Sequence, residues 1–326
     1  MIKVIVSVLL LALLCCGIGY QQLQAALSMP LNVTNSTLFK VDRGTGFNQL
    51  CKQWQSKQWL DSCFKFQVLA KLDPTLTDLK AGLYELDSTS VIDNIRRINQ
   101  GAQVSFSFTI IEGQPLREVI TNIAKQTHLK QDLDEENLAK QISNKDENLE
   151  GWLFPDTYHY HSEDTASSVL KRAYSKMQTE LDNAWQNRAH DLILNSPYEA
   201  LILASIIEKE TGLASERPLI SAVFTNRLKS NMRLQTDPTV IYGIGADFDG
   251  DIKRKDLTTY TPYNTYKIKG LPPTPIAMPS RAALLAAVNP PESEYVYFVA
   301  KGDGSHQFSK TLKEHNRAVQ QYQLNK

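Results

Sequence analysis

The sequence predicts an α+β protein with three parts: an N-terminal membrane-spanning helix, a small α+β module and a larger mixed α+β domain. Three observations support this. An uncharged, mostly apolar run fills residues 4–20. Period-two strand patterns alternate with helical patterns along the rest of the chain. The length of 326 residues fits about two domains. We place the parts at residues 1–22, 23–103 and 104–326.

The first part is predicted to be an uncleaved, single-pass anchor. Lys3 precedes the apolar run, which is just long enough to span a bilayer. A cleaved signal peptide is the alternative, but residues 23–26 (LQAA) offer small residues on one side only. With the short positive end inside, and with no second long apolar run, the rest of the chain lies on the far side of the membrane.

The small module reads as strand, helix, helix, strand and helix. Gly101 is expected to end the last helix, which Ser90 caps. The expected elements are residues 38–41, 47–56, 61–72, 82–86 and 90–99. Cys51 and Cys63 fall in this module, on the side of the membrane where disulfides form. Their spacing leaves both a disulfide and two packed thiols open.

The larger domain begins with the best strand pattern of the chain, at residues 104–111, which alternates and is rich in β-branched and aromatic residues. A loop rich in Pro, Gly, Thr and Tyr, residues 263–280, has the composition of a cleft wall. A last strand is expected at 295–300, before a polar C-terminal helix. Helices are expected at residues 116–126, 166–189, 197–211 and 215–230, with a solvated helical excursion at 132–147.

Residues 199–212 are the most informative stretch. The helix is apolar on all sides, which is typical of a buried helix, and it ends in Glu208 and Glu210. Gly212 is expected at its C′ position, which puts Glu210 in the last turn, stacked over Ile206 and Ile207. Apolar surroundings and helix carbonyls both raise a carboxyl pKa, as a general acid near neutral pH requires. A purely structural alternative pairs both glutamates with arginines such as Arg217 or Arg227.

Two other stretches carry candidate site residues. Residues 150–158 (EGWLFPDTY) combine aromatic rings with acids, so they fit either a sugar cleft or a buried loop core. Asp237 before Pro238 reads as a helix cap and first helical residue, with Gly243 as the stop. Gln235 and Thr236 then lie at the cap turn, where they can reach a ligand.

Composition and motifs exclude several classes of function. Lys plus Arg equals Asp plus Glu at 35 each, which argues against a broad nucleic-acid surface. The chain has no Gly-x-Ser-x-Gly elbow, no phosphate-binding glycine loop and no His-Glu-x-x-His motif. Residues 247–251 (DFDGD) place their glycine wrongly for a calcium loop, so a polar surface turn is expected. We therefore expect no metal and no cofactor.

Several motifs in order resemble the endolytic murein lytic transglycosylases (MltG/YceG-like family), over most of the chain. They are residues 204–211 (ASIIEKET), 215–217 (SER), 226–228 (NRL) and 233–243 (RLQTDPTVIYG), with 151–157 (GWLFPDT), 263–266 (YNTY), 270–273 (GLPP) and 297–300 (YFVA) extending the match.

The resemblance implies a lyase of the bacterial inner membrane with its catalytic domain in the periplasm. The module would be LysM-like and bind glycan. The enzyme would cleave the β-1,4 bond between N-acetylmuramic acid and N-acetylglucosamine in nascent peptidoglycan strands, leave 1,6-anhydro ends and terminate the strands beside peptidoglycan synthases. The catalytic glutamate maps onto Glu210. The expected substrate-binding or orienting residues are Gln235, Thr236, Tyr242, Asn226 and Arg227.

Two other functions stay open at this point. A hydrolytic muramidase would use Asp237 or Glu216 as a second carboxylate. A noncatalytic, membrane-tethered glycan-binding scaffold would need no acid at all. Glu208 is the second choice for the acid.

Overall fold

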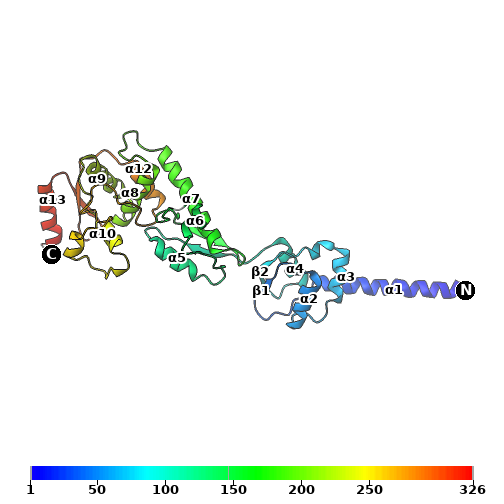
Figure 1. Cartoon of the computed structure of the whole chain (residues 1–326). Helices are drawn as coiled ribbons and strands as arrows, with labels where there is room; N and C mark the ends of the chain where they lie inside the picture. Colours follow the sequence, from blue (N-terminus) through cyan, green and yellow to red (C-terminus); the bar gives the residue numbers. More distant parts are fainter. Residues whose placement is uncertain (1, 146, 325–326) are drawn as a thin grey trace. The chain divides into compact units, whose positions relative to one another are not determined.

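The computed structural model describes residues 2–145 and 147–324 and has a mixed α+β architecture, as predicted (Figure 1). The chain divides into two compact units. The first contains the chain up to Phe106 together with His128–Lys130 and His159–Asp164. The second contains Ser107–Thr127, Gln131–Tyr158 and the chain from Thr165 onward.

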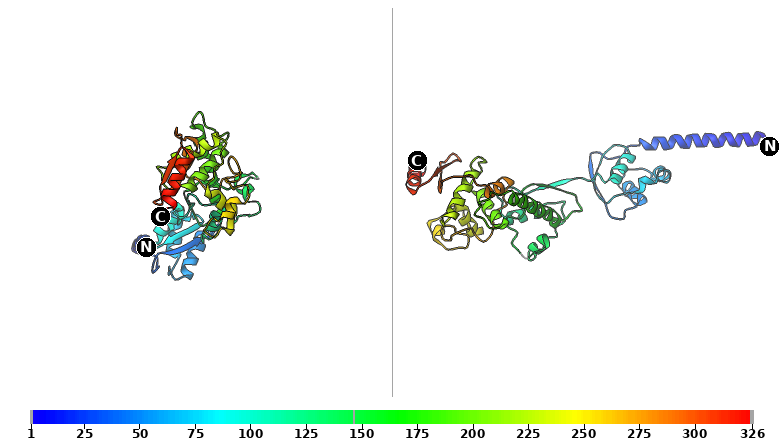
Figure 2. Two further views of the ribbon diagram at one scale, coloured as in Figure 1. Left: turned by 90° about the vertical axis from the view of Figure 1, so that its left-hand side faces the viewer. Right: turned by 90° about the horizontal axis from the view of Figure 1, so that it is seen from above.

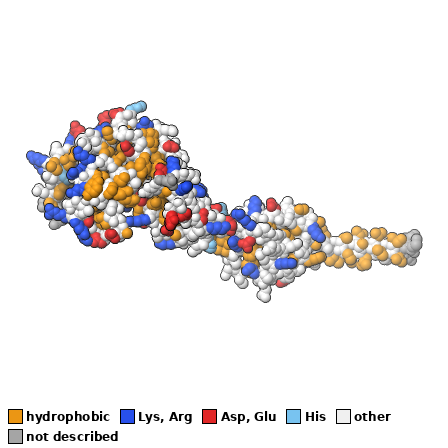
Figure 3. Space-filling model, in the orientation of Figure 1, with side chains coloured by type: hydrophobic (Ala, Val, Ile, Leu, Met, Phe, Trp, Pro, Cys, Tyr) orange, Lys and Arg blue, Asp and Glu red, His pale blue; other side chains and the backbone are white. Residues whose placement is uncertain are grey.

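Helix α1 (Ile2–Leu27) carries the apolar run. By length and composition it is long and apolar enough to cross a membrane, and Figure 3 shows hydrophobic side chains over its surface. The helix extends past the predicted end of the anchor because its last turns pack on the first unit. Ala26 is buried there, and the Lys65 ammonium donates to the Gln22 side chain at 2.8 Å.

The rest of the first unit is the small α+β module. Strand β1 (Thr37–Val41) pairs antiparallel with β2 (Gly82–Leu86). Buried aromatic and branched side chains, among them Trp54, Phe66 and Tyr84, fill its core. Of the two states that the sequence left open for Cys51 and Cys63, the structure has the disulfide. The helices of the module are α2 (Phe47–Ser56), α3 (Phe64–Leu72), the 3₁₀ turn η1 (Pro74–Thr77) and α4 (Val91–Gln100).

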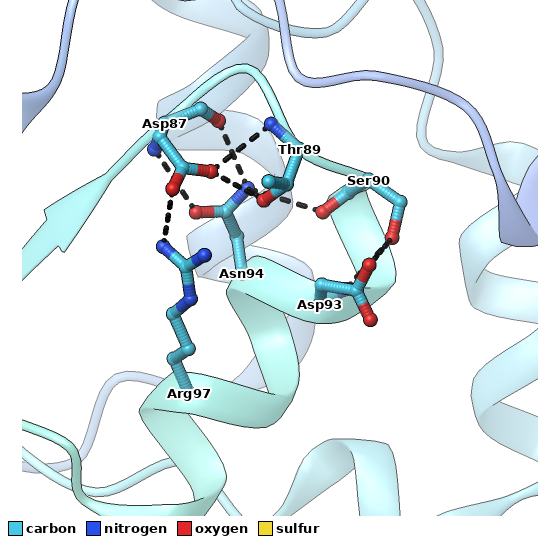
Figure 4. Close-up of polar contacts among 6 residues, drawn as sticks. All are labelled: Asp87, Thr89, Ser90, Asp93, Asn94 and Arg97. Carbon is cyan, nitrogen blue, oxygen red and sulfur yellow. Dashed lines mark hydrogen bonds and ion pairs between the residues drawn. The ribbon is translucent and has the colours of Figure 1, made fainter.

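Polar contacts fix the start of α4 (Figure 4). The Ser90 hydroxyl accepts the Asp93 backbone N–H at 3.0 Å, which is the predicted cap. The fully buried Asn94 side chain donates to the Asp87 carbonyl at 3.0 Å and accepts the Asp87 N–H at 3.2 Å. Arg97 pairs with the Asp87 carboxylate at 2.7 Å. Asn94 and Arg97 therefore tie α4 to Asp87, the residue that follows β2.

The second unit is mostly helical, with short two-stranded sheets. The antiparallel hairpin of β5 (Tyr297–Ala300) and β6 (His306–Ser309) lies wholly in this unit, whereas the sheet of β3 (Phe106–Thr109) and β4 (Thr157–Tyr160) has residues in both units. Its helices are α5 (Leu116–Ala124), α6 (Leu138–Ser143), α7 (Ala166–Gln186), α8 (Pro197–Glu210), α9 (Arg217–Lys229), α10 (Asp237–Ile244), α11 (Arg254–Thr258), α12 (Arg281–Val288) and α13 (Leu312–Val319), with a 3₁₀ turn η2 (Gly245–Asp247) and a final turn η3 (Gln320–Leu324).

Helix α8 is the centre of this unit. It packs against α7, α9, α10 and α12, and its residues 200–207 are buried, as the sequence predicts. The buried Ser205 hydroxyl donates to the Ile202 carbonyl at 2.7 Å and accepts the Ile276 N–H at 3.0 Å, so the one polar group inside the helix is satisfied. Helix α13 packs on the β5–β6 hairpin, and both lie together in every view of the unit (Figures 1 and 2).

Helices α3, α5 and α7 are each shorter than predicted at one end. The ends of α8 and α10 differ from the prediction in three further details. Helix α8 ends with Thr211 in an extended conformation, so Gly212 is not a left-handed C′ residue. The N-cap of α10 is Thr236, and Asp237 is its first residue. Helix α10 continues past Gly243 and ends before Gly245, whose φ of 73° suits only glycine well.

Candidate active site

Glu210 is the last residue of α8. The Thr236 hydroxyl donates to its carboxylate at 2.5 Å. Part of the side chain faces a cavity, but the protein around the carboxyl removes most of its water, and this burial raises the pKa of Glu210. The nearby Asp237 carboxylate raises it further, while Thr236, His306 and Arg227 act in the opposite direction. Within the described parts of the chain, no basic side chain lies within ion-pair distance of Glu210.

The segment that presents Thr236 is held by the loop predicted to form a cleft wall. The Thr236 N–H donates to the Thr265 hydroxyl at 3.0 Å, and the Gln235 N–H donates to the Thr265 carbonyl at 3.2 Å. Gln235 has a φ of 50°, in the left-handed region that a non-glycine residue seldom adopts. The surrounding contacts therefore hold a strained residue beside the carboxyl, as is common at functional sites.

Arg227 is buried and holds the backbone around the site. Its Nε donates to the Val296 carbonyl at 2.6 Å, and its Nη1 donates to the Leu234 carbonyl at 2.8 Å. The guanidinium lies over the Tyr297 ring, 5.2 Å from its centroid. One side chain thus ties α9 to the Thr236 segment and to the start of β5, and it leaves a positive charge near Glu210.

A cavity of about 510 Å³ opens at Glu210. Strand β5 and helix α13 form one wall, with the Tyr297 ring stacked on His315 at 5.1 Å. On another wall the Tyr266 hydroxyl donates to Asp237 at 2.6 Å. The lining residues are Glu210, Arg227, Gln235, Asp237, Tyr266, Tyr297, Phe298, Val299, Ala300, His306, Leu312, His315, Asn316, Val319 and Gln323.

The predicted site residues are not all brought together. Glu210, Gln235 and Arg227 line the cavity, and Thr236 contacts the Glu210 carboxylate. Tyr242 lies outside the lining, where its hydroxyl donates to Glu150 at 3.0 Å. The Asn226 amide nitrogen donates hydrogen bonds to the Ser293 and Tyr295 carbonyls, at 2.7 and 2.9 Å.

Glu208 has structural partners. Its carboxylate accepts the Ser280 N–H at 2.9 Å and the Ser280 hydroxyl, and it pairs with Arg217 at 3.4 Å. The structural alternative weighed from the sequence therefore applies to Glu208 and Arg217. Glu210 has no such pair.

The aromatic stretch 150–158 forms a buried loop core. Phe154 and Tyr158 are buried, and Trp152 stacks on Tyr198 at 6.0 Å. Glu150 is buried as well and accepts the Leu116 N–H at 2.9 Å; its burial raises its pKa to about 7. This stretch does not line the Glu210 cavity.

Sequence reasoning assigned no role to His306, Tyr266, Tyr297 or His315, although all of them line the cavity. Two of these residues lie in motifs that carry the family resemblance, at 263–266 and 297–300. These motifs mark Tyr266 and Tyr297 as candidates, but no local sequence pattern places either residue near Glu210.

The arrangement can supply one proton to a leaving group and take one back. Glu210 is the carboxyl with a raised pKa in the cavity, while the Asp237 carboxylate is occupied by Tyr266. A raised pKa keeps a carboxyl protonated closer to neutral pH, which suits a general acid. The aromatic walls suit the faces of sugar rings.

Comparisons with known proteins identify the family of the chain. The sequence profile of the YceG-like family matches residues 39–321. An endolytic murein transglycosylase of Bacillus subtilis is 35% identical over 74% of this chain and 73% of its own length. One from Streptococcus pneumoniae is 28% identical over 98% of this chain and 65% of its own length. A crystal structure of a yceG-like protein from Listeria monocytogenes is 29% identical, with a TM-score of 0.56, over 87% of this chain and 99% of that one. The resemblance seen in the sequence is thus confirmed, and the chain belongs to the YceG-like family.

Proposed function

We propose that the chain is an endolytic murein transglycosylase, a lyase that cleaves the β-1,4 bond between N-acetylmuramic acid and N-acetylglucosamine and leaves 1,6-anhydro ends. One observation carries the proposal: a single carboxyl with a raised pKa, Glu210, faces a large cavity with aromatic walls. Membership of a family whose curated relatives are endolytic murein transglycosylases supports it.

The chemistry needs only one carboxyl group. Protonated Glu210 donates its proton to the glycosidic oxygen as the bond to the muramic C1 breaks. The carboxylate then accepts the proton of the C6 hydroxyl of the same sugar, whose oxygen attacks C1. Because the nucleophile belongs to the substrate, its proximity supplies much of the rate, and no second carboxylate is required.

The neighbours of Glu210 then take defined roles in the proposal. Thr236 orients the carboxyl through its hydroxyl. Gln235 and Arg227 contribute to the substrate-facing wall, Arg227 chiefly by holding the backbone and by its charge. Asn226 and Tyr242 act indirectly. Asn226 holds the backbone that leads into β5, and Tyr242 holds helix α10 against Glu150.

The other parts of the chain are consistent with an enzyme that acts on peptidoglycan outside the cytoplasm. Helix α1 would anchor the protein in the inner membrane, with both units in the periplasm and the module acting as a LysM-like glycan-binding unit. A disulfide within the module agrees with an oxidising compartment. Peptidoglycan synthases that produce the nascent strands would be the nearby partners.

The test compares Glu210→Gln with the wild type on purified glycan strands, with products analysed by mass spectrometry. Gln cannot transfer a proton, so we expect anhydro products to fall by about 10²- to 10⁴-fold. Wild-type yields from the variant would overturn the assignment and favour a noncatalytic scaffold. Reducing ends that incorporate labelled water would instead indicate a hydrolytic muramidase that uses Asp237, whose carboxylate also lines the cavity.

A further inference from the structure

We propose that His306 is a glycan-binding residue of the Glu210 cavity: its Nε2 accepts a hydrogen bond from a sugar hydroxyl or acetamido N–H, and Glu216 is its positioning residue. This inference rests on the proposed function, because it assigns a role within the same site. Membership of the family does not by itself assign a role to His306 or Glu216.

Glu216 uses both carboxylate oxygens on His306. Oε2 lies 2.7 Å from the imidazole Nδ1, and Oε1 accepts the His306 backbone N–H at 2.9 Å. The side chains are 13% and 11% exposed, respectively. Glu216 precedes α9 and His306 begins β6, so the pair also joins two elements that are 90 residues apart.

This contact fixes which imidazole nitrogen can meet a ligand. A carboxylate only accepts hydrogen bonds, so Nδ1 carries the proton that it donates to Glu216. In the neutral ring, Nε2 is then left with a lone pair. The Phe298 ring packs edge to face against the imidazole at 5.3 Å, which limits its rotation. The same carboxylate–imidazole arrangement orients histidines in metal sites and catalytic triads.

His306 lines the same cavity as Glu210. Two polar neighbours are already used: the Tyr266 hydroxyl donates to Asp237, and the Arg227 Nε and Nη1 atoms donate to backbone carbonyls. Peptidoglycan sugars offer hydroxyl and acetamido N–H donors, and an acceptor is needed to orient them. Nε2 of His306 is an acceptor in the lining whose orientation a second side chain, Glu216, fixes.

Two isosteric variants separate ligand binding from a structural role. In His306→Asn, the amide nitrogen replaces Nδ1 and keeps the bond to Glu216, but no atom remains at the Nε2 position. In His306→Gln, the amide reaches the Nε2 position, but the bond to Glu216 is lost. We expect His306→Asn to keep the wild-type Tm and to lose about 10- to 100-fold in kcat/KM, as the loss of one ligand hydrogen bond implies. His306→Gln should retain more activity at a lower Tm.

Glu216→Gln gives an independent readout. Its amide can face Nδ1 with an N–H group, which moves the ring proton to Nε2 and turns the acceptor into a donor. We expect kcat/KM to fall about 10-fold or more while the Tm changes little. His190→Asn is the matched control, because His190 is exposed and does not line the cavity. It should match the wild type in both measurements.

All variants are assayed as the full-length, detergent-solubilised chain on purified glycan strands, with Glu210→Gln alongside. If His306→Asn is as active as the wild type, or if only His306→Gln loses activity together with stability, the inference is wrong and the pair is structural. If Glu210→Gln is inactive in the same experiment, the proposed function still stands even though the inference about His306 is wrong. An active Glu210→Gln would instead reject the proposed function, and with it this inference.

Discussion

Two carboxyl groups of the second unit, Glu150 and Glu210, have raised pKa values, and burial is the main cause for both. Their surroundings give them different tasks. Glu210 faces the cavity and meets one hydroxyl, whereas Glu150 is closed in between the Leu116 N–H and the Tyr242 hydroxyl. The first is placed to exchange a proton with a ligand, and the second links the start of α5 to α10.

The raised pKa of Glu150 makes stability depend on pH in a defined direction. Its pKa is about 7 in the folded protein against an ordinary value of 4.5. Between these values the folded chain keeps a proton that the unfolded chain releases, so stability from this group is complete below pH 4.5 and is lost as pH rises to 7. The difference amounts to on the order of 3 kcal/mol in the free energy of unfolding.

Glu150→Gln removes this titration and can still meet both partners. We expect the variant to gain stability relative to the wild type by on the order of 3 kcal/mol between pH 4.5 and pH 8. Urea unfolding across this range measures the gain. Glu118→Gln, which changes an exposed glutamate on α5, should show a constant difference from the wild type. A constant difference for Glu150→Gln as well would rule out the buried titration.

At the scale of elements, the last three residues of α8 include one glutamate with a structural role, Glu208, and one with a proposed chemical role, Glu210. Glu208 joins α8 to the N-cap of α12 through Ser280 and to the start of α9 through Arg217. Glu210 points into the cavity instead. Different sides of the last turn of one buried helix thus carry a structural carboxylate and a candidate catalytic one.

This division predicts opposite effects for two matched substitutions. Glu208→Gln loses the charge opposite the partly buried Arg217, so the free energy of unfolding should fall by about 1–3 kcal/mol while kcat is retained at temperatures where the protein is folded. Glu210→Gln should lose activity without losing stability, because a neutral amide costs less to bury than a carboxylate. Unfolding curves and product analysis on the same preparations measure both. If Glu208→Gln is folded but inactive, Glu208 takes part in the reaction and the division is wrong.

The same elements show what one sequence can and cannot predict. The limits of β2 and α2 match the predictions, since period-two alternation, the glycine turn and the apolar face are local signals. The buried character of α8 was readable for the same reason. The Glu216–His306 and Glu150–Tyr242 contacts span 90 and 92 residues, and no local pattern links their partners. Strand β3 is shorter than predicted, because apolar alternation continues where strand pairing stops.

At the scale of the whole molecule, three features point to one compartment. An N-terminal helix is apolar enough to cross a membrane, the adjoining module contains a disulfide, and the second unit has the site proposed to act on peptidoglycan. Cytosolic thiols stay reduced, so a disulfide between Cys51 and Cys63 forms only if the module is exported. The redox state of these two thiols therefore reports the orientation of the chain.

Thiol labelling of the full-length chain in a bacterial host tests this orientation. Cys15→Ala and Cys16→Ala first remove the free cysteines of α1. We expect no reaction with a maleimide-linked polymer under denaturing, non-reducing conditions, and reaction of both Cys51 and Cys63 after reduction. The matched control lacks residues 4–20, stays in the cytoplasm and should react without reduction. Reaction of the full-length chain without reduction would place the module in the cytoplasm, where the proposed enzyme could not reach its substrate.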